Sequence, residues 1–348
     1  MPILQEERGI GMKPCTRVGI DVTWRCQQKC NHCFYKRSPL LGTAYDVPID
    51  IVKGKIDRAR QGGCNHAVMV GYGEPALCQN TLEIIRYCKS LNMASSMITN
   101  GAVALRKYQE FFQEGIDHLH ISSHGIGNTL DDIVQQKGAF DLQAKLKDWL
   151  RENNYPFRTN ITLQKANYRE LPNAACYEIS KGVYHFVMLG FLPHYEWKDH
   201  LNEVLVHPAE LLPYIEEAAD LLLNSNTLFT IRYHPFCHLS PKYWPYVVNA
   251  RYVNYDPWEW NYDLQIDNLN RLWQNSLHLG ESVANDCHDC LLRDHCGGWN
   301  RTIAGYFESK VLKPITVIPD MYIEAVKTLG GLHDLNPAND VTGTIRMS

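Results

Sequence analysis

The chain has 348 residues, of which 45% are hydrophobic and 21% are charged, and its formal net charge is -4. This is the composition of a globular protein, and without a run of Lys or Arg it gives no reason to expect a nucleic-acid or anionic-membrane partner. No stretch approaches the roughly 20 apolar residues that span a bilayer. Residues 1–14 lack the apolar core of a signal peptide. We therefore expect a cytoplasmic protein with no nucleic-acid and no membrane partner.

The first two thirds of the chain alternate between strand-like and helix-like stretches. Strands are predicted at residues 17–23, 66–71, 95–99, 118–122, 158–163 and 185–189. Helical patterns lie between them, at residues 49–59, 80–90, 105–114, 140–152 and 168–180. Such alternation predicts a parallel sheet with right-handed crossovers. Because six units are visible and not eight, we expect an α/β fold with a partial (βα)6 TIM-like barrel, whose reactive groups lie at the carboxyl ends of the strands.

The pattern changes after about residue 191. Residues 194–208 are predicted to be an inserted loop, and residues 209–223 a helix. Beyond residue 227 the chain is rich in Tyr, Trp, Pro and Asn, and the Tyr- and Trp-rich run at 243–262 is either the packed core of a small domain or the lining of a substrate pocket. We place a domain boundary near residue 225, between a barrel at 1–225 and a small irregular extension at 226–348.

Three cysteines follow the first predicted strand with the spacing C-x3-C-x2-C, namely Cys26, Cys30 and Cys33. Three thiolates can hold three irons of a [4Fe–4S] cluster and leave the fourth iron free to bind a ligand. The alternative is a structural zinc site, which usually has four ligands. His32 could supply the fourth only by crowding its neighbours, so the spacing favours a catalytic iron–sulfur cluster.

A turn with two glycines follows the second predicted strand and consists of Gly71, Tyr72, Gly73, Glu74 and Pro75. Glycines let the backbone approach a ligand closely. This turn and the cysteine spacing, with His32 just before the last cysteine, resemble the radical SAM superfamily over roughly residues 15–225. The family has Gly-Gly-Glu-Pro at this place, so Tyr72 is a departure, while the Gly-Glu-Pro core is intact.

The resemblance implies a [4Fe–4S] cluster on the three cysteines, S-adenosylmethionine on the free iron, and a flavodoxin or ferredoxin as electron donor. Reductive cleavage would give methionine and a 5′-deoxyadenosyl radical, which abstracts hydrogen from the substrate. His32 is expected to pack near the adenine, and the turn, through Glu74, to bind the methionine moiety. Polar strand ends imply further cofactor contacts at Asn100, Ser123 and Asn160, and Leu189 would lie along the adenine. For these four residues, a turn or barrel-lining role is the alternative.

A second cysteine group lies near the C-terminus, with Cys287, Cys290 and Cys296 in the spacing C-x2-C-x5-C and Cys237 upstream. Four cysteines would complete an auxiliary [4Fe–4S] cluster. Beside a radical SAM core, the spacing resembles the extensions called SPASM and twitch domains. The full SPASM pattern has another cysteine where this chain has Trp299 and Asn300, so at most one auxiliary cluster fits.

Two alternatives remain open for this second group. Zinc could be bound there with help from His238, His288 or His295. If Cys237 is not a ligand, the auxiliary cluster has an open iron that could hold substrate, or Cys237 could donate hydrogen to a product radical.

The leading functional hypothesis is a radical SAM enzyme that acts on a small metabolite or natural-product intermediate, by dehydrogenation, epimerisation or a related rearrangement. The alternative is a maturase that modifies a ribosomally made peptide. No segment before residue 15 is long enough to recognise a leader peptide, which weakens that alternative. A third hypothesis, from another class, is a non-catalytic iron–sulfur or zinc protein, although an open iron has little use without a ligand.

Overall fold

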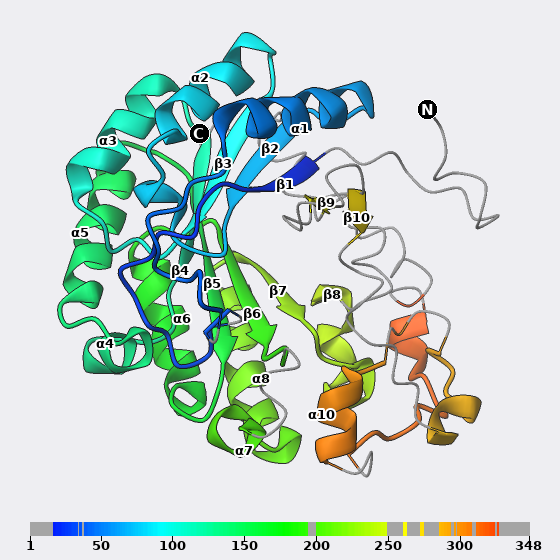
Figure 1. The fold of residues 1–348 in the computed structure, drawn as a ribbon. Helices are drawn as coiled ribbons and strands as arrows, with labels where there is room; N and C mark the ends of the chain where they lie inside the picture. The colour runs from blue at the N-terminus through cyan, green and yellow to red at the C-terminus, as the bar shows by residue number, and fades with distance from the viewer. Residues whose placement is uncertain are drawn as a thin grey trace.

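A curved, mostly parallel sheet with helices on its outer face makes up most of the part of the chain that the structure describes (Figure 1). The computed structural model describes residues 17–33, 35–36, 38–193, 200–248, 260–262, 272–274, 285–293, 296, 298–307, 311–323 and 326. Within these residues the strand order is β10-β9-β1-β2-β3-β4-β5-β6-β7-β8. β10 and β8 lie at the two edges, so the sheet is not closed into a barrel.

The repeating units follow one another in chain order. The strands of the parallel part are β1 (Arg17–Asp21), β2 (His66–Val70), β3 (Ala94–Thr99), β4 (His118–Ser122), β5 (Phe157–Leu163), β6 (His185–Gly190) and β7 (Leu228–Arg232). The helices between them are α1 (Ile49–Gln61), α2 (Thr81–Ser90), α3 (Leu105–Glu114), α4 (Asn128–Val134), α5 (Ala139–Glu152), α6 (Leu171–Ser180), α7 (Leu201–Val204) and α8 (Pro208–Asn224).

Alternating side chains decide which face of each strand meets the helices. In β4, Leu119 and Ile121 belong to the main apolar core, whereas His118 and His120 between them do not. β5 has the same arrangement, with Phe157 in that core and Arg158 outside it. Successive side chains of a strand point to opposite faces, so one face of the sheet packs against helices and the other lines the barrel with polar groups.

The partial barrel predicted from the sequence is confirmed, and the structure adds further elements to it. The six predicted strands form β1 to β6, and β7 extends the parallel sheet past residue 225 by pairing with β6. The domain boundary near that residue stays a prediction. α4 was not predicted, and the short helix α7 lies in the segment that was expected to be a loop, whose residues 194–199 are outside the described part.

The chain after β7 has short elements. These are β8 (Val247–Val248), β9 (Trp260–Tyr262), β10 (Leu272–Gln274), α10 (Arg301–Tyr306) and the 3-10 helices η4 (Phe236–His238), η5 (Pro241–Tyr246) and η8 (Asn285–Asp289). Tyr243 and Trp244 are buried in the second apolar core, so this part of the aromatic run packs and does not line a pocket. Most of the remaining run lies outside the described residues. No helix in the described part is long and apolar enough to cross a membrane.

Candidate active site and auxiliary cysteine pocket

The loop that carries Cys26, Cys30 and Cys33 follows β1 and is held at its back by α4. The backbone N–H of Lys29 donates to the carbonyl of Val134 at 3.1 Å, and that of Asn31 donates to the carbonyl of Ile133 at 2.8 Å. The last carbonyls of a helix have no partner within the helix. The last carbonyl groups of α4 therefore accept hydrogen bonds from this loop. This helix, which the sequence analysis did not predict, helps to fix the loop conformation.

The three thiols of this loop lie close enough to influence one another. Burial raises the pKa of Cys26 to about 12, and the charges of Glu74 and Cys33 add to the shift. Burial also raises the pKa of Cys30, where the charges of Cys33 and Cys26 contribute, and the pKa of Cys33. A thiolate needs a positive partner in such a place. Three soft thiol ligands gathered in one partly buried loop fit iron of a [4Fe–4S] cluster.

The turn after β2 packs directly on the backbone of the cysteine loop. The N–H of Gly73 donates to the carbonyl of Thr23 at 3.0 Å, and the N–H of Glu74 donates to that of Arg25 at 2.6 Å. A Cβ atom at Gly73 would lie 2.2 Å from the Arg25 carbonyl oxygen, which is closer than Cβ atoms in proteins approach other atoms. Only glycine fits here, because the two backbones touch.

The carboxylate of Glu74 joins the ends of β2 and β3. It is 2% exposed and accepts hydrogen bonds from the N–H of Ala76 at 2.9 Å, the hydroxyl of Thr99 at 2.6 Å and the N–H of Asn100 at 2.6 Å. Burial raises the pKa of Glu74, and these three donors oppose the shift. The geometry gives this carboxylate a structural task, and its predicted contact with the methionine moiety stays a prediction.

Three aromatic rings surround the same junction. Trp24 stacks on Tyr72 with 4.1 Å between ring centroids, and Tyr35 meets the edge of Tyr72 at 4.3 Å. The departure from the family's glycine at Tyr72 thus fills space between the turn and the cysteine loop. Stacked and edge-to-face rings stabilise such a contact.

His32 connects the cysteine loop to β5. Its Nε2 lies 3.2 Å from Nε2 of His124, and its Nδ1 lies 3.0 Å from Nε2 of the Gln164 amide. Nδ1 of His124 accepts the N–H of Thr162 at 3.2 Å, and burial holds the pKa of His124 well below its ordinary value. A neutral His124 therefore carries its proton on Nε2, the nitrogen that faces His32. The predicted packing of His32 near the adenine is not tested by these contacts.

The four other predicted cofactor residues lie in different settings. The Asn100 side chain exchanges hydrogen bonds with Gln27 of the cysteine loop, at 3.2 and 3.3 Å. The Ser123 hydroxyl accepts from Lys147, whose ammonium also pairs with Glu178 in the helix layer. Oδ1 of Asn160 accepts from Arg158 at 3.2 Å, and Leu189 is half-buried on β6. The structure thus brings Asn100 to the cysteine loop and turns Ser123 toward the helices, and the cofactor roles of all four stay predictions.

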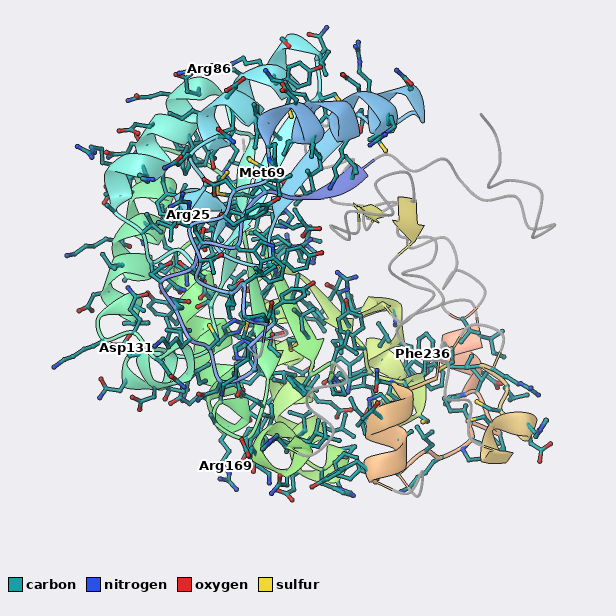
Figure 2. The ribbon with its side chains drawn as sticks, in the orientation of Figure 1. Arg25, Met69, Arg86, Asp131, Arg169 and Phe236 are labelled. Carbon is teal, nitrogen blue, oxygen red and sulfur yellow. The ribbon has the colours of Figure 1, made fainter. Side chains whose placement is uncertain are left out.

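The second cysteine group lines a pocket that lies far from the first. Cys237, Cys287, Cys290 and Cys296 line one cavity of about 30 Å³, whose apolar walls include Phe236, Leu292, Leu312 and Ile315. Figure 2 shows Phe236 well apart from Arg25 in the cysteine loop. Two residues that are distant in sequence, 237 and 287, therefore meet at one site.

Backbone amides point at the sulfur atoms of this pocket. The N–H of Gly298 donates to Sγ of Cys296, and that of Ile315 donates to Sγ of Cys290, both at 3.4 Å. Burial raises the pKa of Cys237 to about 12, opposed by the N–H of Lys313 and assisted by the charges of the other three cysteines. Four cysteines with N–H···S bonds in an apolar pocket fit the donor set of a [4Fe–4S] cluster.

The histidines of the zinc alternative are engaged elsewhere or lie outside the described residues. His238 Nε2 lies 3.2 Å from the carbonyl of Val311, and Nδ1 of the exposed His288 lies 3.0 Å from the Arg293 guanidinium. His295 is not among the described residues. In the part of the chain that the structure describes, no three His, Cys, Asp or Glu side chains are arranged to hold a single metal ion.

Comparison with known proteins adds a family and several relatives. Residues 20–175 match the model of the Radical SAM superfamily. A PqqA peptide cyclase of Methylobacterium nodulans is 26% identical over 215 residues, which are 58% of this chain and 54% of that protein. The Fe-coproporphyrin III synthase of Methanosarcina barkeri is 26% identical over 155 residues, which are 44% of this chain and 38% of that protein. The chain thus matches about two fifths to one half of the length of these relatives.

Solved structures share the fold at low sequence identity. Native anSMEcpe with bound AdoMet and Kp18Cys peptide superposes with a TM-score of 0.59 at 15% identity, covering 94% of this chain and 98% of that one. Streptococcus suis SuiB bound to the precursor peptide SuiA gives a TM-score of 0.53 at 16% identity, covering 62% and 48% of the two chains. Together with the family match, the cysteine loop and the open parallel sheet show that residues 20–175 form a radical SAM domain, the enzyme domain whose cofactors are a [4Fe–4S] cluster and S-adenosylmethionine.

Proposed function

We propose that the chain is a radical SAM enzyme that modifies a peptide. The observation that carries this proposal is the similarity to PqqA peptide cyclases, one of which matches 58% of the chain. The sequence by itself favoured a small metabolite, and the relatives support the peptide alternative better. The shared fold with anSMEcpe and SuiB, whose structures contain peptides, is compatible with it.

In this proposal Cys26, Cys30 and Cys33 hold the SAM-cleaving cluster. When bound, the cluster and S-adenosylmethionine supply a carbon radical that abstracts hydrogen from the substrate. The protein's own contribution is to hold the cysteine loop in position. α4 holds the loop from behind, and Gly73 and Glu74 fix it to β2. A flavodoxin or ferredoxin remains the electron donor that we propose.

Cys237, Cys287, Cys290 and Cys296 hold an auxiliary cluster in the same proposal. Their pocket supplies N–H donors to sulfur, and such bonds together with burial set the potential of an iron–sulfur cluster. Cys237 takes the fourth ligand position because it faces the same pocket as the other three. A full set of four protein ligands leaves no iron open for substrate, so the substrate would bind at the barrel.

The test uses the reconstituted full chain, S-adenosylmethionine, a chemical reductant and synthetic peptides that tile the short open reading frames beside the gene. We expect one peptide to stimulate 5′-deoxyadenosine formation and to change in mass, as measured by mass spectrometry. A deuterated version of that peptide should pass deuterium to the 5′-deoxyadenosine.

A small-molecule panel that includes porphyrins is the necessary comparison, because Fe-coproporphyrin III synthase is also a relative. If a member of this panel and no peptide stimulates 5′-deoxyadenosine formation, the result contradicts the peptide proposal and favours a small-metabolite substrate. The variant with Cys26, Cys30 and Cys33 all changed to Ala must form no 5′-deoxyadenosine with any substrate.

A further inference from the structure

His234 lies just after β7, at the carboxyl end of the parallel sheet. This is the edge at which barrels of parallel strands carry their functional groups. The ring is 3% exposed. It faces the ring of His238, with 6.4 Å between centroids, and His238 in turn meets Trp299 at 4.8 Å. His234 therefore lies between the end of the barrel and the region that carries the auxiliary cysteines.

Neither ring nitrogen of His234 has a hydrogen-bond partner within the part of the chain that the structure describes. Burial lowers the pKa of this imidazole to about 4, so the ring is neutral near pH 7 and offers one N–H donor and one nitrogen acceptor. Buried polar groups are nearly always paired, because an unpaired one loses its water without compensation. A buried ring with both nitrogens unpaired therefore indicates a site where a ligand supplies the missing partners.

The backbone around His234 is shaped to place it. Tyr233 has φ of 65°, a left-handed conformation that is uncommon for a non-glycine residue and costly for a bulky one. At the end of β6, Gly190 leaves the space that the ring occupies, since a Cβ there would lie 3.1 Å from Nε2 of His234. The strained Tyr233 and the glycine together hold the imidazole at the sheet edge.

We propose that His234 contacts the substrate and that its two ring nitrogens pair with one N–H and one C=O of a peptide. A peptide group presents these two partners, a donor and an acceptor, for which the ring has the complementary acceptor and donor. The inference rests on the proposed peptide substrate. His234 then binds and orients the peptide at the barrel mouth, beside the auxiliary pocket.

The test compares His234→Phe, which keeps a planar ring without hydrogen bonds, with His234→Gln, which keeps a donor and an acceptor. Binding of the fluorescein-labelled peptide identified above is measured by anisotropy on the reconstituted chain with S-adenosylmethionine, and kcat and KM are measured separately. We expect His234→Phe to lose at least about tenfold in affinity and His234→Gln less than that. Iron content and peptide-independent cleavage of S-adenosylmethionine should match the wild type. His200, which is 40% exposed and contacts Glu203, is changed to Phe as the control and should bind as the wild type does.

Equal peptide binding by the wild type and His234→Phe, with a higher melting temperature in the variant, would overturn the inference and make His234 a packing residue. If His234→Phe does not fold, His234→Leu replaces it with the same expectations. A wild-type protein that binds no peptide and turns over a small molecule removes the proposed function, and the His234 inference with it. Loss of affinity confined to His234 variants supports both.

Discussion

The two cysteine regions are built in different ways. The three cysteines of the first lie within eight consecutive residues, 26–33, and their loop follows β1 directly and is fixed by hydrogen bonds to α4 and to the turn after β2. The four cysteines of the second come from two segments about 50 residues apart, on 3-10 turns and loops with sparse regular structure. The first site therefore belongs to the carboxyl edge of the sheet, whereas the second is lined by cysteines from segments that are distant in the sequence.

This difference predicts where metal matters for folding. A parallel sheet with a buried core holds the first loop whether or not iron is bound. The second region has short elements, and Cys290 and Cys296 are only partly buried against the second apolar core. We therefore expect cluster ligation to contribute a larger share of its stability, as in other small metal domains. Loss of each cluster should therefore have different consequences.

The largest effect is expected when Cys26, Cys30 and Cys33 are all changed to Ala. Cleavage of S-adenosylmethionine should be abolished, and iron should fall by about four per chain, because a cubane carries about four. Iron and acid-labile sulfide after anaerobic reconstitution measure this, with the exposed Cys176 changed to Ala as the control. The melting temperature should barely change. A large drop would contradict the view that the sheet holds the loop without metal.

The second largest effect is expected for Cys287 and Cys290 changed to Ala. Iron should again fall by about four per chain. Here hydrogen exchange should increase around η8 and α10 while the amides of β1 to β6 stay protected, because the pocket loses its closure. The same pattern should follow removal of iron from the wild type by a chelator. Unchanged exchange around the pocket would mean that the apolar walls alone hold this region.

Gly73→Ala tests the contact between the turn and the cysteine loop. The new Cβ would meet the Arg25 carbonyl, so one backbone must shift, at a cost of about 1–3 kcal/mol in the free energy of unfolding. Denaturant unfolding measures the cost, and the EPR signal of the reduced cluster reports the displaced loop. Gly54→Ala in α1 is the matched control, since its Cβ would meet nothing within 4 Å and should stabilise the helix slightly.

The smallest effect is expected for Tyr72→Gly, which restores the glycine of the family's turn. Loss of stacking on Trp24 and of the edge contact with Tyr35 should cost about 0.5–1.5 kcal/mol beyond the lost burial. Tyr72→Phe keeps the ring and should remain close to the wild type in the same unfolding experiment. Equal losses for both variants would show that the hydroxyl, and not the ring, holds the turn.

Local patterns in the sequence were sufficient to find the six strands and to predict the first cluster site. Alternating and helical periodicities predicted β1 to β6 because each depends on residues within one element. The spacing of Cys26, Cys30 and Cys33 predicted an open-iron site because the ligands share one short loop. The short α4 was not predicted, because seven residues give little periodicity. Its contribution is two carbonyl groups that accept hydrogen bonds from the backbone N–H groups of Lys29 and Asn31.

Other features depend on partners that are distant in the sequence, and only the tertiary structure decided them. Cys237 joins the later cysteines because the chain after β7 returns to the same pocket. Ser123 turns to Lys147 and Glu74 to Thr99 because those partners sit on neighbouring elements. His234 has no sequence signal at all, since its burial against Gly190 and its unpaired nitrogens exist only once β6 and β7 lie side by side. The sequence by itself therefore determined the fold class and predicted the cofactors, whereas packing between distant segments decided which polar groups are paired and which are not.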